Sequence, residues 1–276
     1  MSTLTNSTLP PTKKREPGLD ELLGRADPAL CAELDDLSKL RLDYFIDPSI
    51  SIIQHKKQFC INSDSAALAL FIENGTAIRN RRVLEIGPNN GALMVYLDRL
   101  EPAYLCGIEL QKQPAALARL NLSLFATAPH SILTGSAVDT DAGEDTYDVV
   151  LCNPPYFELP DNRNAKDLNS KELARFETEL DPANMIACAR RHLKSNGRFC
   201  FVHRPDRLSE IFAELEKASF APYRVQIAYD ARSAKACALL VEAIKEGTCA
   251  VRFEAPMWYD GSPHPKTGLT PQELYR

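Results

Sequence analysis

Residues 83–91, Val-Leu-Glu-Ile-Gly-Pro-Asn-Asn-Gly, pass from a run typical of a buried strand into a turn bounded by glycines. Leucines at helical spacing follow over residues 93–100. A strand, a tight turn and a helix in this order form the first unit of an open α/β sheet, whose ligands bind beyond the carboxyl ends of the strands. Gly87 and Gly91 fall where the backbone must approach such a ligand. The Glu85 carboxylate could accept a hydrogen bond from a ligand ammonium.

The alternation of strand and helix continues along the chain. We predict further strands over 104–108, 132–133, 147–152, 199–202, 223–227 and 236–244. The helices between them should cover 65–73, 113–125, 181–193 and 207–218. Such a series predicts a mainly parallel sheet covered on both faces. Ser63 and Asp64 offer a cap for the first of these helices. The polar link 229–235 is too short for a crossover helix, so the last two strands should pair antiparallel.

The residues before 47 have a different character. Residues 1–18 are rich in Ser, Thr, Pro and Lys, which predicts a disordered tail. Leucines at helical spacing over 19–46, restarted at Asp27-Pro28, predict two short helices. We therefore divide the chain into the tail (1–18), a helical appendage (19–46) and an α/β domain (47–276).

Composition limits the environment and the partners. The chain has no run of 18 apolar residues and no secretory signal, so we expect a cytoplasmic protein without a membrane span. Its eight cysteines are scattered without a Cys-x-x-Cys pair, which favours reduced thiols over disulfides or a metal site. A net charge of −5 argues against a large nucleic-acid surface but allows a local basic patch. We expect a monomer without a metal.

A second carboxylate indicates a nucleoside. Glu109 ends the strand 104–108, about twenty residues beyond the turn, where a carboxylate can accept hydrogen bonds from both ribose hydroxyls. The turn and Glu109 together favour an adenosine-bearing ligand. They do not distinguish a nicotinamide cofactor from S-adenosylmethionine.

Residues 153–156, Asn-Pro-Pro-Tyr, do distinguish the two ligands. Pro154 and Pro155 fix an extended backbone and remove two N–H donors, so carbonyl groups dominate the loop. The Asn153 amide oxygen and the Pro154 carbonyl can accept both hydrogens of one NH₂ group, and Tyr156 offers a flat face to a planar substrate. This arrangement aims the lone pair of a weakly nucleophilic nitrogen at an activated methyl group. The pattern predicts an amino-methyltransferase that uses S-adenosylmethionine.

Over about residues 50–276 the chain resembles a known family. Asn-Pro-Pro-Tyr at the end of the fourth strand looks like the loop of methyltransferases that act on adenine N6, cytosine N4 or protein glutamine. The remainder resembles the bacterial tRNA1(Val) adenine-N6 methyltransferases. The stretches that carry the resemblance are 58–59 with 63–65, 83–91, 107–111, 152–157, 174–177, 202–205, 241–247, 256–260 and 270–275. It implies a Rossmann-like class I methyltransferase fold: a mostly parallel seven-stranded sheet with a C-terminal antiparallel strand and helices on both faces.

The resemblance also implies roles for individual residues. The activity would be N6-methylation of the adenosine beside the anticodon of tRNA1(Val), with S-adenosylmethionine as cofactor and tRNA as partner. The catalytic residues would be Asn153, Pro154, Pro155 and Tyr156. The cofactor would bind at Glu85, Gly87, Asn89, Gly91, Glu109 and Ser136. The substrate would contact Phe157, Arg175, His203, Arg204 and Arg207.

Two departures from the family pattern keep alternatives open. Asn89 stands where the family usually has glycine, and Ser136 stands where an aspartate often contacts the cofactor adenine, although Asp139 could substitute from a shifted loop. A cofactor-binding module that has lost catalysis would explain both, but the intact Asn-Pro-Pro-Tyr loop opposes it. The other alternative is a protein-glutamine methyltransferase acting on a release factor, because a glutamine amide presents similar NH₂ geometry. His203-Arg204-Pro205 and the C-terminal tail favour the tRNA branch.

Overall fold

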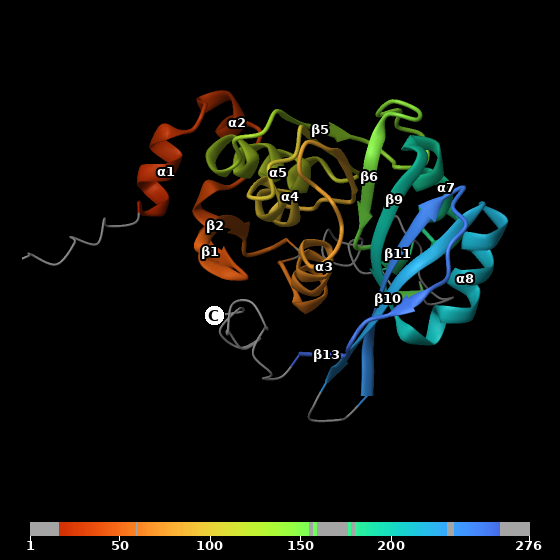
Figure 1. The fold of residues 1–276 in the computed structure, drawn as a ribbon. Helices are drawn as coiled ribbons and strands as arrows, with labels where there is room; N and C mark the ends of the chain where they lie inside the picture. Colours follow the sequence, from red (N-terminus) through yellow and green to blue (C-terminus); the bar gives the residue numbers. More distant parts are fainter. Residues whose placement is uncertain are drawn as a thin grey trace, which may run out of the picture.

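The structure, a computed structural model, describes residues 17–58, 60–154, 180–230 and 235–259, and the backbone of 157–158 and 176–177. Most of the predicted tail, residues 1–16, lies outside this range. The described residues build a central sheet with helices on both of its faces (Figure 1). None of the described helices has the length and apolar character needed to cross a membrane.

The strand order of the sheet is β12-β10-β11-β9-β6-β3-β4-β5, with β13 paired to β10. The strands are β3 (Arg82–Ile86), β4 (Tyr104–Glu109), β5 (His130–Thr134), β6 (Tyr147–Cys152), β9 (Leu193–His203), β10 (Phe220–Asp230), β11 (Lys235–Lys245), β12 (Arg252–Phe253) and β13 (Met257–Trp258). β3 pairs in parallel with both β4 and β6, so the strand order reverses at β3. In open α/β sheets, that reversal opens a crevice for a ligand.

The predicted fold class is confirmed by this topology. β11 runs antiparallel to β10, as the short polar link predicts, and it also runs antiparallel to β9. The two-residue strands β12 and β13 extend the edge of the sheet beyond the predicted strands. The helix predicted over 181–193 ends at His192, because Leu193 is already extended and pairs with Tyr147 of β6. Burial of both side chains accounts for the early start of β9.

Helices pack in two layers (Figure 1). One layer contains α3 (Ser63–Glu73), α4 (Ala92–Asp98) and α5 (Lys112–Phe125), and the other contains α7 (Pro182–His192) and α8 (Leu208–Lys217). The helix α3 starts two residues before its predicted start. Its cap is Asn62, whose side chain accepts a hydrogen bond from the Ser65 backbone, so the prediction of a cap at Ser63 or Asp64 is wrong.

The N-terminal region is only partly helical. Helices α1 (Leu19–Arg25) and α2 (Pro28–Ala32) form as predicted, but a 3-10 turn η1 (Leu37–Lys39) leads into an antiparallel hairpin of β1 (Leu40–Phe45) and β2 (Asp47–His55). The helical expectation for residues 40–46 is therefore wrong. The buried Asn121 side chain of α5 binds the backbone N–H and C=O of Ile53 and the carbonyl of Asn90, each over 2.8–2.9 Å. These bonds tie the hairpin to the turn after β3.

Candidate functional site

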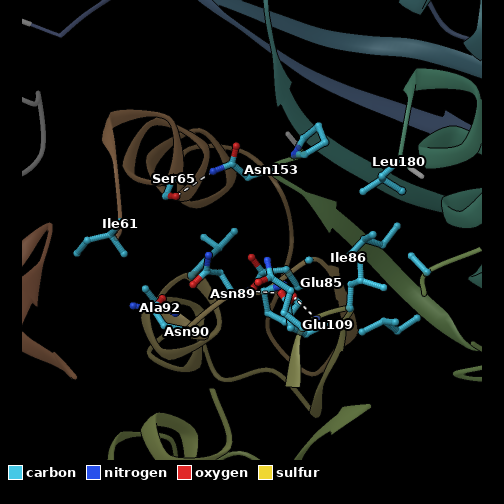
Figure 2. A pocket seen from close by; sticks show the side chains of 18 of the residues that line it. Ile61, Ser65, Glu85, Ile86, Asn89, Asn90, Ala92, Glu109, Asn153 and Leu180 are labelled. Atoms are coloured by element: carbon cyan, nitrogen blue, oxygen red, sulfur yellow. Dashed lines mark hydrogen bonds between the residues drawn. The ribbon is translucent and has the colours of Figure 1, made fainter. Parts of the chain in front are cut away.

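A pocket of about 1010 Å³, its open mouth included, lies at the carboxyl ends of β3, β4 and β6. Figure 2 shows Asn153 and Ser65 across this pocket from Glu85 and Glu109. The residues that line it are Cys60, Ile61, Ser65, Glu85, Ile86, Gly87, Pro88, Asn89, Asn90, Ala92, Leu93, Ile108, Glu109, Leu110, Gln111, Ser136, Ala137, Val138, Asn153, Pro154 and Leu180. Five of the six residues predicted to bind the cofactor are among them, together with two of the predicted catalytic loop.

The exception is Gly91, which does not line the pocket. Gly91 has a φ of 77°, and a Cβ there would meet the Ala118 backbone of α5 at 3.3 Å. Its role is therefore the close packing of α4 against α5. Gly87, with a φ of 70°, has open space around it and faces the pocket. The left-handed backbone at both positions favours glycine.

Asn89, where the resemblance leads us to expect glycine, adopts a turn conformation that glycine usually takes. Its φ is 51°, a left-handed conformation that asparagine tolerates better than other side chains. The Asn89 backbone N–H donates to Glu109 Oε2 over 2.8 Å, and the Gln111 N–H donates to Glu109 Oε1 over 3.0 Å. Glu109 is 5% exposed, and its burial raises the pKa of the carboxyl group against the effect of these donors. The loop and the end of β4 thus fix one carboxylate at the pocket.

Glu85 is a second buried carboxyl group in the pocket. It is 3% exposed, and its Oε2 has no hydrogen-bond partner among the described residues. Burial, and then the nearby Glu109, raise the pKa of Glu85 to about 8. A buried carboxylate without a partner is costly unless a cation or donor meets it. This orphaned oxygen is what a ligand ammonium would require.

Glu85→Gln should change how the stability of the ligand-free protein depends on pH. The folded-state pKa of about 8 lies above the ordinary value of 4.5, so wild-type stability falls as pH rises from about 4.5 to 8 and levels off above that. Between pH 7 and pH 8 the wild type should lose about 1 kcal/mol of unfolding free energy that the variant keeps. Parallel urea titrations measure this difference. Identical pH dependence of the two proteins would show that Glu85 has an ordinary pKa.

Asn153 follows β6 and is oriented by the first turn of α3. Its Nδ2 donates to Ser65 Oγ over 2.9 Å, and Ser65 Oγ donates in turn to Asn62 Oδ1 over 3.0 Å. Because the Asn153 amide nitrogen faces Ser65, the Asn153 amide oxygen points away from Ser65 (Figure 2). The contact with Ser65 was not predicted. The only sequence signal was the stretch Ser63-Asp64-Ser65, in which we interpreted Ser63 and Asp64 as a helix cap and Ser65 as the first residue of the helix.

Three of the predicted substrate residues, His203, Arg204 and Arg207, do not line the pocket. His203 is 1% exposed, burial lowers its pKa to about 4, and its Nδ1 accepts a hydrogen bond from the Arg204 N–H. Arg204 pairs with Asp206, and Arg207 pairs with Glu210. These three residues sit at and just beyond the end of β9, so they share the sheet edge with Asn153 without lining its pocket.

Other predicted residues fall into two groups. Pro155, Tyr156 and Arg175 lie outside the described residues, and Phe157 is described only as backbone of β7 (Phe157–Glu158), which pairs in parallel with β8 (Phe176–Glu177). Ser136 lines the pocket, and its Oγ accepts a hydrogen bond from the Val138 N–H over 3.2 Å. Asp139 is exposed and does not line the pocket, so the shifted-loop substitution is not seen.

Comparison with known proteins identifies similar sequences. Residues 49–220 match the family model of the methyltransferase small domain. The tRNA1(Val) (adenine(37)-N6)-methyltransferase of Cronobacter sakazakii is 28% identical over 198 residues, which cover 63% of this chain and 79% of that protein. The enzyme of the same name from Shigella dysenteriae serotype 1 is 27% identical over 139 residues. That match covers 49% of this chain and 55% of the relative.

Solved structures show the same fold at lower identity. A predicted O-methyltransferase from Agrobacterium tumefaciens superposes with a TM-score of 0.56 and 22% identity, covering 76% of this chain and 94% of that one. A ribosomal protein L11 methylase from Lactobacillus delbrueckii subsp. bulgaricus superposes with a TM-score of 0.51 and 15% identity, covering 73% and 84%.

Proposed function

The chain belongs to the methyltransferase small-domain family, and on this premise we propose that it methylates N6 of the adenosine beside the anticodon of tRNA1(Val). Methyl transfer from S-adenosylmethionine is the activity class of this family and fold. The choice of tRNA is supported by the names of the curated relatives. The observation that carries the proposal is Asn153, oriented by Ser65 at the wall of a pocket that also holds Glu85 and Glu109.

The residues of the pocket fit S-adenosylmethionine. Glu109, held by two backbone N–H groups, would accept hydrogen bonds from the ribose hydroxyls. Glu85 would pair with the ammonium group, which supplies the partner that its Oε2 lacks among the described residues. Leu110 and Val138, both exposed at the pocket, offer apolar surface to the adenine ring. When bound, the cofactor supplies a methyl group activated by a positively charged sulfur.

Asn153 and Pro154 would orient the target nitrogen. The lone pair of an adenine amine is spread into the ring, so the amine is a weak nucleophile. The Asn153 amide oxygen and the Pro154 carbonyl would each accept one of its hydrogens, which favours tetrahedral geometry and aims the lone pair into the pocket. Ser65 fixes which side of the amide carries the acceptor, since it engages the nitrogen.

Ser65→Ala should lower the turnover number by roughly threefold to tenfold, the worth of one hydrogen bond, while leaving S-adenosylmethionine affinity unchanged. Its hydroxyl accepts the hydrogen bond that orients Asn153 and donates its own hydrogen to Asn62. Ser123→Ala is a matched control, because the Ser123 hydroxyl binds only the Leu120 carbonyl of its own helix among the described contacts. Steady-state kinetics at saturating cofactor compare the two variants. Equal turnover numbers for the Ser65→Ala and Ser123→Ala variants would show that Ser65 does not position Asn153.

The substrate is tested by offering three acceptors to the purified protein. With labelled S-adenosylmethionine, we expect label in total tRNA, recovered as N6-methyladenosine, and little label in duplex DNA, whose bases must first be unstacked. Label in a release factor as methylglutamine, with none in tRNA, would favour the protein-glutamine alternative. Cofactor binding without transfer to any acceptor would indicate a module that has lost catalysis.

A further inference from the structure

A half-buried tyrosine and an exposed tryptophan form an aromatic pair at the edge of the sheet. Tyr229, near the end of β10, and Trp258, in β13, occupy paired positions, and their ring centroids lie 5.4 Å apart at an interplanar angle of 38°. Trp258 is 37% exposed, although tryptophan is usually well buried. The Tyr259 N–H donates to the Tyr229 carbonyl over 2.9 Å, which holds the two strands together beside the rings.

The pair lies on the same edge of the sheet as Asn153. Cys152, the residue before Asn153, pairs with Phe201 of β9, and His203 at the end of β9 pairs with Leu239 of β11. β11 then pairs Ala236 with Tyr229. Through β9 and β11, the carboxyl end of β6 and the end of β10 that holds Tyr229 therefore lie at the same end of the sheet.

A direct contact also joins the two places. Tyr259, the neighbour of Trp258, donates its hydroxyl hydrogen to Asp64 Oδ1 over 3.0 Å. Asp64 precedes Ser65 in the first turn of α3, and Ser65 accepts the hydrogen bond from Asn153. Figure 1 shows β13 alongside the region of α3, far from β5 at the other side of the sheet. The segment 257–259 is thus fastened to the helix turn that orients the catalytic amide.

The acceptor that this pair suits is an unpaired base. With a net charge of −5, the protein cannot hold RNA by bulk charge alone. Aromatic side chains bind single-stranded bases by stacking, largely independently of sequence, and the loops of folded RNA present bases that can splay outward. We propose that Tyr229 and Trp258 form a stacking platform for an unpaired RNA base that flanks the target adenine. This inference rests on the proposed function and specifies how the protein binds the RNA substrate beside the target adenine.

Trp258 is the only tryptophan of the chain, so its fluorescence reports on the platform directly. Wild-type protein is titrated with an RNA hairpin whose loop carries unpaired adenines, and with an RNA duplex of the same composition. We expect saturable quenching by the hairpin and none by the duplex. Filter binding on the same samples measures RNA affinity independently of the fluorescence.

Variants separate stacking from a general loss of structure. Trp258→Ala should raise the KM for tRNA roughly tenfold with turnover at saturating tRNA retained, whereas Trp258→Phe should stay close to wild type. Phe253→Ala is the matched control: Phe253 is 63% exposed on the neighbouring β12, opposite Val225 at the far part of β10, and should leave KM unchanged.

Three results would overturn the platform. They are unchanged fluorescence while filter binding shows bound RNA, equal quenching by duplex and hairpin, and a Trp258→Ala KM equal to that of Phe253→Ala. If the wild type methylates tRNA in any of these cases, the proposed function stands and only the platform is wrong. If the wild type neither binds nor methylates RNA, both proposals are wrong.

Discussion

Asn153→Ala should lower the turnover of methyl transfer by about a hundredfold or more while the protein stays folded and its affinity for S-adenosylmethionine is kept. The amide oxygen is the proposed acceptor for the target amine, and alanine removes it together with the donor that binds Ser65. Cofactor affinity should persist because Glu85 and Glu109, on β3 and β4, are untouched. Single-turnover assays at saturating cofactor and RNA measure the chemical step.

Asn153→Asp sharpens this test. Aspartate keeps acceptor oxygens at the position but cannot donate to Ser65 Oγ as the amide nitrogen does. We therefore expect the aspartate variant to be slower than wild type and faster than the alanine variant. An alanine variant with near wild-type turnover would show that Asn153 does not orient the amine. Thermal melts of each variant check that the fold is intact.

Glu109→Ala should weaken S-adenosylmethionine binding by about tenfold to a hundredfold, because a charge-assisted hydrogen bond contributes roughly 1.5–3 kcal/mol. The carboxylate is buried at the end of β4 and is fixed by the N–H groups of Asn89 and Gln111. Titration calorimetry measures the affinity. Glu101→Ala is a control of the same chemistry, since Glu101 is exposed and, among the described residues, its carboxylate forms an ion pair only with Arg79.

The result for Glu109 also separates binding from bracing of the loop. Loss of the Asn89 hydrogen bond alone would loosen the turn and lower the melting temperature in the absence of cofactor. A variant with a lower melting temperature and unchanged cofactor affinity would show that Glu109 stabilises the turn at Asn89 and does not bind the cofactor. A lower affinity with an unchanged melting temperature would place Glu109 against the cofactor.

The sheet and its switch point could be predicted because their signals are local. The run 83–91 carries strand, turn and helix start within nine positions, and Glu109 follows at the end of the next strand. The prediction failed at residues 40–46, where a few leucines at helical spacing could not outweigh burial of Leu40 and Phe45 in a hairpin. A segment as short as residues 40–46 does not distinguish the hydrophobic period of a helix from that of a strand.

Contacts between distant residues could not be predicted. Ser65 and Asn153 are 88 positions apart, so no pattern within α3 announces their hydrogen bond. The same holds for the buried pair Arg224 and Glu242, which joins β10 to β11, while the Arg224 guanidinium donates to the Phe71 carbonyl of α3 over 2.8 Å. These bonds anchor the end of α3 opposite to Ser65. A single sequence without aligned relatives gives no sign of which distant polar residues meet.

We propose that this chain methylates adenine N6 in tRNA, and nucleoside analysis of a deletion strain tests this activity most directly. Total tRNA is digested and analysed by mass spectrometry from the wild-type strain, the deletion strain, and the deletion strain carrying either the wild-type or the Asn153→Ala gene. We predict that N6-methyladenosine disappears on deletion, returns with the wild-type gene and stays absent with Asn153→Ala. Unchanged N6-methyladenosine in the tRNA of the deletion strain would contradict the claim.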